Sequence, residues 1–164
     1  MAELLIRLVL WLFVIDLGIA FGAGLYESRV MVPQWLRFSA ESGYHWDGAA
    51  AREANSGLRF WVYVTTVPLT LLTLASMVAV FQVQGGARGF WLCAILAVLV
   101  DRSMTFAYFI PTMIRLTRDE TPSPSEAVAT ALRWVRLGYV RHAATLVAWL
   151  AALQAFALLG ARQG

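Results

Sequence analysis

The chain of 164 residues contains no lysine and a single cysteine, and only 14% of its residues are charged. All thirteen basic residues are therefore arginine. Because one cysteine cannot form a disulfide or a dithiol pair within the chain, intrachain thiol–disulfide chemistry is excluded. That residue, Cys93, lies in an apolar run, where a thiol packs as a small, inert hydrophobic group.

The sequence also lacks the motifs of most cofactor-dependent enzymes. It has no phosphate-binding glycine loop, nucleophile elbow or dinucleotide fingerprint. Its two histidines are far apart, and neither has a partner at the spacing typical of metal ligands. We therefore expect no metal and no bound cofactor. The formal charge of +3 comes from scattered arginines, so we expect no nucleic-acid partner either.

Hydrophobic residues dominate what remains. They make up 60% of the chain, and the mean hydropathy is +0.66, values typical of membrane proteins. A helix that crosses a bilayer needs about 20 apolar residues. Four segments qualify, at about 4–26, 60–83, 89–114 and 138–160. We predict an all-α fold: a single transmembrane domain over 1–164, an integral membrane four-helix bundle with a long, partly structured loop between its first two helices.

The fourth helix has a strong start signal before its apolar segment. Ser123 is a good capping residue, Pro124 suits the first helical position, and Glu126 follows three residues after the cap. We therefore predict an amphipathic helical lead-in at about 124–137, with Gly138 as a site for a bend.

The distribution of arginine predicts the orientation in the membrane. Four spans place both termini and the 84–88 turn on one side, and loops 27–59 and 115–137 on the other. The loop side carries eight arginines, whereas the other side carries only Arg7, Arg88 and Arg162. The positive-inside rule then predicts cytoplasmic loops in a bacterial inner membrane, with membrane lipid as the first partner.

Polar residues recur at helical spacing on every span, and each set lies on one face. The four faces are Asp16, Ala20, Ala23 and Glu27; Asn55, Arg59, Tyr63, Thr66, Thr70 and Thr73; Asp101, Thr105, Tyr108, Thr112 and Arg115; and Gly138, His142, Thr145 and Trp149. Turned inward, these faces predict a polar, aromatic-lined cavity open towards the arginine-rich side. The alternative is that these side chains only bond between helices, without a cavity.

A small-residue pattern lies on the opposite face of the first span. Gly18 and Gly22 form a G-x-x-x-G motif, which is typical of close helix packing. The sequence leaves open whether that packing occurs within the fold, in a homo-oligomer or in a larger membrane complex.

Three ionisable side chains fall near the middle of the predicted bilayer. A charge at this depth costs about 2.5–3.5 kcal/mol on insertion scales, so it is rarely kept without a partner or a role. Asp16 and Arg102 are predicted to form a structural ion pair between the first and third helices. The alternative is that these two residues, with Asp101, relay protons or anchor a polar substrate.

His142 is the only histidine in a span, next to Arg141 and one turn from Thr145. An imidazole titrates near neutral pH, so His142 is a candidate general base. The alternative is a structural role through hydrogen bonding.

Three groups of residues resemble the small four-helix membrane proteins related to anthrone oxygenases. They are Gly18-Ile19-Ala20-Phe21-Gly22-Ala23-Gly24, then Phe109-Ile110-Pro111 followed by Leu116, and then Trp134, Gly138 and Arg141. This resemblance implies oxidation of a polycyclic anthrone to a quinone by O2 without a bound cofactor. Such chemistry needs a base, cations for an oxyanion and a dry aromatic pocket.

Those requirements predict the site residues. The catalytic candidates are His142, Asp101, Tyr108, Arg115 and Arg141. The substrate-binding candidates are Tyr63, Thr66, Trp134, Trp149 and Glu27. The first hypothesis is thus an intramembrane site for a lipophilic aromatic or quinone-like molecule, with oxygenase chemistry. The alternatives are an accessory subunit of a larger membrane complex, without catalysis of its own, and a small transporter that needs water on both sides of Asp101.

Overall fold

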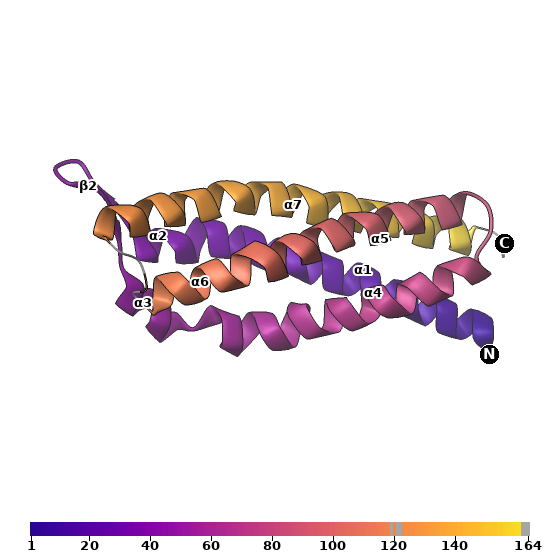
Figure 1. The fold of residues 1–164 in the computed structure, drawn as a ribbon. Helices are drawn as coiled ribbons and strands as arrows, with labels where there is room; N and C mark the ends of the chain where they lie inside the picture. The colour runs from indigo at the N-terminus through magenta and orange to yellow at the C-terminus, as the bar shows by residue number, and fades with distance from the viewer. Residues whose placement is uncertain (119, 121–122, 162–164) are drawn as a thin grey trace.

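The computed structural model describes residues 1–118, 120 and 123–161. Arg162, which entered the orientation prediction, lies outside these residues, as do positions 119 and 121–122 of the predicted loop 115–137. Four long helical segments run alternately up and down beside one another, which confirms the predicted helical architecture (Figure 1). By length and apolar composition each segment is able to cross a membrane: Ala2–Trp35, Gly57–Gln82, Gly86–Thr117 and Pro124–Gly160.

Three of the four segments change helical type along their length. The first comprises α1 (Ala2–Tyr26), the π-helical turn η1 (Glu27–Met31) and α2 (Val32–Trp35). The second comprises the π-helix η2 (Gly57–Thr66), α4 (Val67–Ala79) and the 3-10 turn η3 (Val80–Gln82). The third comprises α5 (Gly86–Met104), the π-helical η4 (Thr105–Phe109) and α6 (Ile110–Thr117). The fourth is the single helix α7 (Pro124–Gly160).

The start of α7 confirms its sequence signal. The Ser123 hydroxyl accepts a hydrogen bond of 3.2 Å from the Glu126 backbone N–H, and Pro124 is the first helical residue. The helix then runs without interruption through Gly138, so the lead-in and the apolar segment form one rod.

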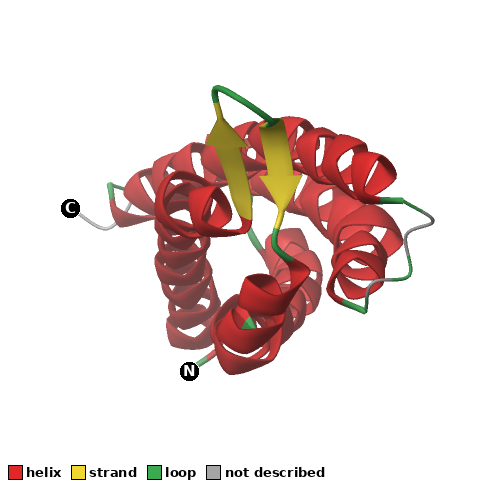
Figure 2. Ribbon diagram, turned by 90° about the vertical axis from the view of Figure 1, so that its left-hand side faces the viewer, coloured by secondary structure: helices red, strands yellow, loops and turns green. Residues whose placement is uncertain are grey.

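The connection between the first two long helices is more ordered than predicted. After α2, an antiparallel hairpin pairs β1 (Leu36–Ser39) with β2 (Gly43–Trp46). The short helix α3 (Gly48–Ala54) follows, capped by Asp47, whose carboxylate accepts from the Ala50 N–H at 2.9 Å. Viewed end-on, the hairpin lies across the end of the bundle opposite the termini (Figure 2).

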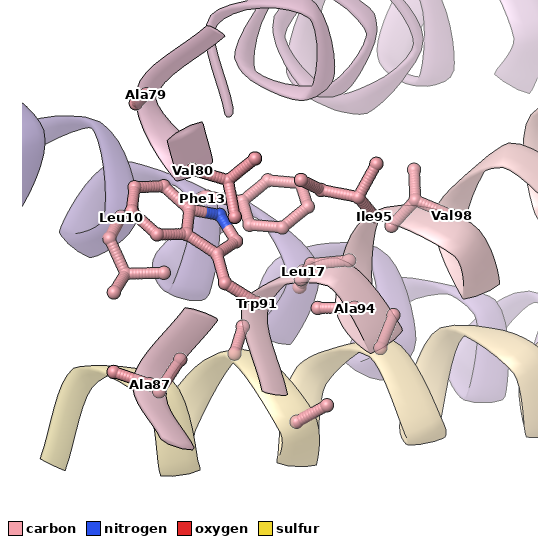
Figure 3. Close-up of a cluster of buried hydrophobic side chains, with 14 of the residues drawn as sticks. Leu10, Phe13, Leu17, Ala79, Val80, Ala87, Trp91, Ala94, Ile95 and Val98 are labelled. Carbon is pink, nitrogen blue, oxygen red and sulfur yellow. The ribbon is translucent and has the colours of Figure 1, made fainter. Parts of the chain in front are cut away.

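The half of the bundle near the termini is filled with apolar side chains. Trp91 is fully buried and packs among Leu10, Phe13 and Leu17 of α1 (Figure 3). Small residues of α7, Ala148 and others one or two turns on, complete this cluster. Side chains packed in this way leave few voids between the helices, so the centre of this half is filled.

A second apolar cluster lies beneath the hairpin. Trp35 and Leu36 from the connection pack there against Leu116 of α6 and against Ala131 and Trp134 of α7. The polar part of the interior therefore lies between two apolar clusters, one at each end of the bundle.

The G-x-x-x-G face is used only in part within the fold. A Cβ added at Gly18 would lie 3.2 Å from the Trp149 indole, whereas one added at Gly22 would meet nothing within 4 Å. Gly18 thus permits close packing of α1 on α7, and Gly22 has no such role in the chain itself.

Candidate functional site

A cavity of about 100 Å³ lies in the polar band between the two apolar clusters, with walls from all four long helices. It brings together six of the residues predicted from sequence: Glu27, Thr66, Asp101, Trp134, Arg141 and His142. The roles of these residues stay predictions, but their convergence supports the predicted inward turn of the polar faces.

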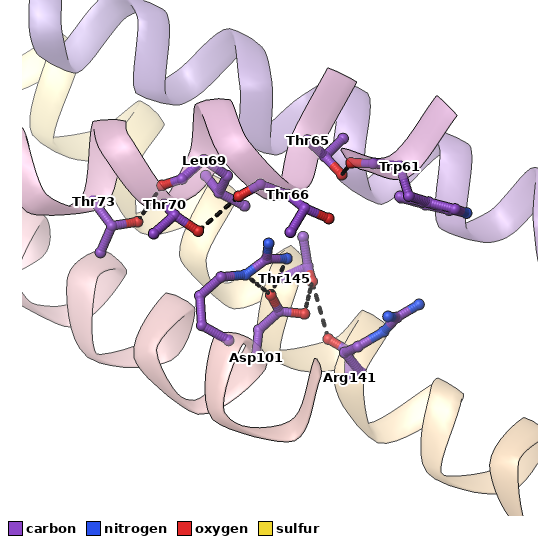
Figure 4. Close-up of polar contacts among 10 residues, drawn as sticks. Trp61, Thr65, Thr66, Leu69, Thr70, Thr73, Asp101, Arg141 and Thr145 are labelled. Carbon is purple, nitrogen blue, oxygen red and sulfur yellow. Dashed lines mark hydrogen bonds and ion pairs between the residues drawn. The ribbon is translucent and has the colours of Figure 1, made fainter. Parts of the chain in front are cut away.

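Asp101 and Arg102 form an ion pair beside the cavity. The Asp101 Oδ2 atom accepts from Arg102 Nε at 2.8 Å and from Nη2 at 2.6 Å. The Thr145 hydroxyl lies 3.3 Å from Asp101 Oδ1 and 3.0 Å from the Arg141 carbonyl oxygen (Figure 4). Both charged side chains are largely buried, so their mutual pairing lowers the cost of keeping them there.

The predicted ion pair between Asp16 and Arg102 is wrong. The Arg102 guanidinium folds back along its own helix to the adjacent carboxylate, which is closer than the one on α1. Asp16 is buried, and its Oδ2 atom has no hydrogen-bond partner within the described part of the chain. Asp16 lies close enough to Arg102 for a Coulombic attraction between the two side chains, but they form no ion pair or hydrogen bond.

Glu27 is held at the opposite side of the cavity by η2. Its Oε1 atom accepts from the Trp61 indole N–H at 2.8 Å and from the Ser56 hydroxyl at 3.2 Å. Two donors on one carboxylate oxygen fix this buried side chain and turn Trp61 towards the interior.

His142 is buried in the cavity wall, and among the described residues neither Nδ1 nor Nε2 has a hydrogen-bond partner. The imidazole packs directly on the backbone of α1 at Gly24. A Cβ added there would lie 2.6 Å from Nε2, so only glycine leaves room for the ring. The position of His142 is therefore set by close contact between α1 and α7 and not by a hydrogen bond.

The Arg141 guanidinium reaches from α7 into the cavity towards Trp61 (Figure 4). Its central carbon lies 4.4 Å from the Phe109 ring centroid and 5.9 Å from that of Trp61. Asp101 and Glu27 attract it from a distance, but no ion pair or side-chain hydrogen bond joins it to another described residue. An arginine held only by ring faces keeps its planar donor fork free for a ligand.

Four of the predicted site residues do not line this cavity. Arg115 is exposed on α6, and Tyr63 is 73% exposed on η2. Tyr108 contacts Phe109 edge-on outside the lining. Trp149 packs on Phe21 with ring centroids 6.0 Å apart. The expectation that these side chains share one space with His142 is therefore wrong.

The change of helical type in η2 accounts for the error at Tyr63. In a π-helix the backbone bonds close from i to i+5, so each turn holds more residues than an α-helical turn. An α-helical period of 3.6 residues per turn predicts that Tyr63 faces the interior of the bundle. In the structure Trp61 and the fully buried Thr65 occupy this inner face instead. Sequence reasoning missed both residues, and nothing in the sequence marks the π-helix.

The threonines of the second helix do not bond between helices. The hydroxyls of Thr65, Thr70 and Thr73 each donate to the backbone carbonyl four residues earlier, at 3.3, 2.6 and 2.6 Å (Figure 4). The interhelical bonding that was the alternative to a cavity is therefore not made by these three residues.

A larger groove of about 440 Å³ lies between η2 and α6 and adjoins the cavity. Both spaces share Gly57, Trp61, Thr66, Ile110 and Met113, as well as Ser56. The cavity was expected to open towards the arginine-rich end. The adjoining groove runs between the two helices towards that end, where Arg52, Asn55 and Thr117 line it.

Comparison with known proteins adds no relative: no family model, no curated protein and no solved structure matches the chain. The resemblance to anthrone oxygenases stays a prediction, and the function is argued from the geometry.

Proposed function

We propose that the chain is an integral membrane protein that binds a lipophilic molecule through an acidic hydroxyl or enol group in the cavity. The four long apolar helices support the membrane location. Their outward faces carry large apolar side chains such as Leu71, Val78, Leu96 and Leu150, all exposed in the isolated chain. Contiguous apolar surface of this extent is stable in lipid and unfavourable in water.

The observation that carries the proposal is that His142 and Arg141, whose side chains make no hydrogen bond or ion pair with another described residue, line one cavity. A neutral imidazole has one unprotonated nitrogen, and both ring nitrogens of His142 lack a partner among the described residues. The adjacent Arg141 offers unpaired donors. His142 is thus placed to take a proton from a bound hydroxyl, enol or activated methylene, and Arg141 to hold the resulting oxyanion.

Cofactor-free oxygenation is the specific reaction that we propose. The substrate is an anthrone-like ketone that enters the cavity by one ring, with its other rings in the adjoining groove, and its activated methylene loses a proton to His142. The carbanion reacts with O2: one oxygen atom becomes the new carbonyl, and the other leaves as water with the two methylene hydrogens. Phe109, Trp61 and Trp134 supply the aromatic walls. Their low polarity strengthens the attraction between Arg141 and the anion.

The filled core argues against a transport path. Coupled transport through Asp101 requires water on both sides of that residue, but Leu17, Val98 and the fully buried Leu69 and Ala148 pack on the terminal side. Access from one side only suits a binding site or an enzyme.

The test measures O2 uptake and quinone formation from anthrone by the full chain in nanodiscs. We expect activity that His142→Gln and Arg141→Gln each lower by about a hundredfold or more, in line with the usual contribution of a general base or oxyanion partner. The matched controls are His45→Gln and Arg133→Gln, which change exposed residues outside the cavity. Equal rates in all five proteins, or no rate above that of empty nanodiscs, contradict the proposed reaction.

A further inference from the structure

We propose that the ligand has two parts: a polar head of about one ring that enters the cavity, and an apolar chain that lies in the groove between η2 and α6. This inference rests on the proposed function, because it concerns the molecule bound at the same site. It specifies the two parts of that molecule and the route by which the molecule reaches the cavity.

The sizes of the two spaces set the division. An apolar cavity of about 150 Å³ is known to hold a benzene molecule. The cavity here, at about 100 Å³, therefore holds at most a head of one ring. A larger molecule must extend into the adjoining groove, which has about 440 Å³.

The chemistry of the walls follows the same division. The charged and titratable groups Asp101, Arg102, Arg141 and His142 line only the cavity. The groove takes Leu58, Val62 and Ile114 as walls of its own, and its polar side chains Arg52, Asn55 and Thr117 lie at the hairpin end. A molecule with a polar head and an apolar chain satisfies both surfaces at once, because each part meets a wall of its own polarity.

The two spaces adjoin, because six residues line both of them: Ser56, Gly57, Trp61, Thr66, Ile110 and Met113. A molecule whose head lies in the cavity can therefore place its chain in the groove.

The direction of access follows from the apolar core and the groove. The core fills the bundle on the terminal side of the cavity, and the groove is the space that adjoins the cavity on its other side. At the outer rim of the groove, Leu58 is 63% and Ile114 is 42% exposed. Their chain neighbours Arg59 and Arg115 are exposed as well, so the rim lies near the arginine-rich end. A lipid-dissolved molecule would reach the site at this level, between η2 and α6.

The test compares para-decylphenol with para-cresol, which has the same head without the chain. Binding to the full-length protein in one detergent is measured by calorimetry. In Ile114→Trp the larger side chain narrows the groove, so para-decylphenol should bind about tenfold more weakly. Para-cresol should bind as it does to the wild type. The matched control is Ile19→Trp, a residue of equal exposure (43%) on α1, which lines neither space.

The outcomes separate this inference from the proposed function. Suppose that Arg141→Gln weakens the binding of both phenols and that Ile114→Trp weakens the binding of neither. The groove then does not hold the alkyl chain, so the inference is wrong while the proposed function stands. If neither phenol binds, or Arg141→Gln changes neither, both proposals fail. If the groove holds a phospholipid that para-decylphenol does not displace in native mass spectrometry, the inference is also overturned.

A second measurement uses the unaltered chain, so it does not depend on the folding of a variant. Para-decylphenol with a photoreactive diazirine in its chain should label residues 58–62 and 110–114. Labelling confined to other segments contradicts the inference.

Discussion

At the scale of single residues, the cavity depends on an unusual contact between Gly24 and His142. The ring nitrogens bind nothing among the described residues, and the imidazole is positioned by the glycine backbone that it touches. A ring held by packing uses neither nitrogen in a hydrogen bond among the described residues, and Nε2 is the nitrogen that faces Gly24. Glycine at position 24 is thus as much a part of the proposed site as the histidine.

This contact predicts that Gly24→Ala destabilises the protein. The new Cβ would lie 2.6 Å from His142 Nε2, so the ring or the helix must move, at a cost of about 1–3 kcal/mol. Gly22→Ala, two residues away, meets open space and is the matched control. Thermal unfolding in detergent should separate the two variants, and adding His142→Ala should restore part of the loss. A Gly24→Ala protein as stable as Gly22→Ala would show that the contact is not close.

The buried pair predicts strong coupling between Asp101 and Arg102. Removing one partner leaves the other charge uncompensated, which costs about 3–5 kcal/mol for a fully buried pair. Asp101→Asn and Arg102→Gln should each lower the unfolding temperature, and the double variant should lose much less than their sum. The corresponding cycle with Asp16→Asn should show weaker coupling. Stronger coupling for Asp16 would mean that Arg102 pairs across to α1 after all.

The sequence predicted that Arg102 is in a buried ion pair, but it did not predict that the partner is Asp101. The depth of Asp16, Asp101 and Arg102 in the chain indicated a buried charge cluster. The choice between two nearby carboxylates depends on side-chain reach and rotamer, which helical spacing does not contain. The same limit hid Trp61, whose position depends on its hydrogen bond to Glu27.

At the scale of elements, the long helices were predictable and their irregular parts were not. Runs of apolar residues predicted four helices, and a serine–proline–glutamate signal predicted where α7 begins. The π-helical turns, and the hairpin in place of a loop, depend on tertiary contacts. The hairpin, for example, is tied to α6 by the Trp46 indole, which donates to the Leu116 carbonyl at 3.3 Å. The neighbouring α3 is tied to α6 by Arg52, which donates to the Thr117 carbonyl.

These ties predict a local effect of Trp46→Phe. The last carbonyls of a helix lack partners within it, so the indole satisfies one that is otherwise unpaired. Its loss should cost about 1 kcal/mol and speed hydrogen exchange in β1, β2 and the end of α6. Tyr44→Phe, which changes an exposed residue of the same hairpin, is the control. Unchanged exchange in Trp46→Phe would show that the hairpin is held by packing alone.

At the scale of the whole molecule, the bundle has three layers along its axis. An apolar core fills the terminal half, an apolar cluster closes the hairpin end, and the charged cavity lies between them. Composition predicted the membrane class and a polar interior, but not the groove between η2 and α6 that adjoins the cavity. The orientation in the membrane, which was predicted from the distribution of arginines, stays a prediction.

The central claim is that a lipophilic ligand places its polar head against His142. The most direct measurement is nitrogen NMR of the protein with isotope-labelled histidine, since the chain has only two histidines and His45 is exposed on the hairpin. The spectrum is recorded with and without para-decylphenol, with His45→Gln for assignment. We predict that the ring nitrogen signals of His142 shift on binding while those of His45 stay in place. Bound para-decylphenol with unmoved His142 signals would contradict the account.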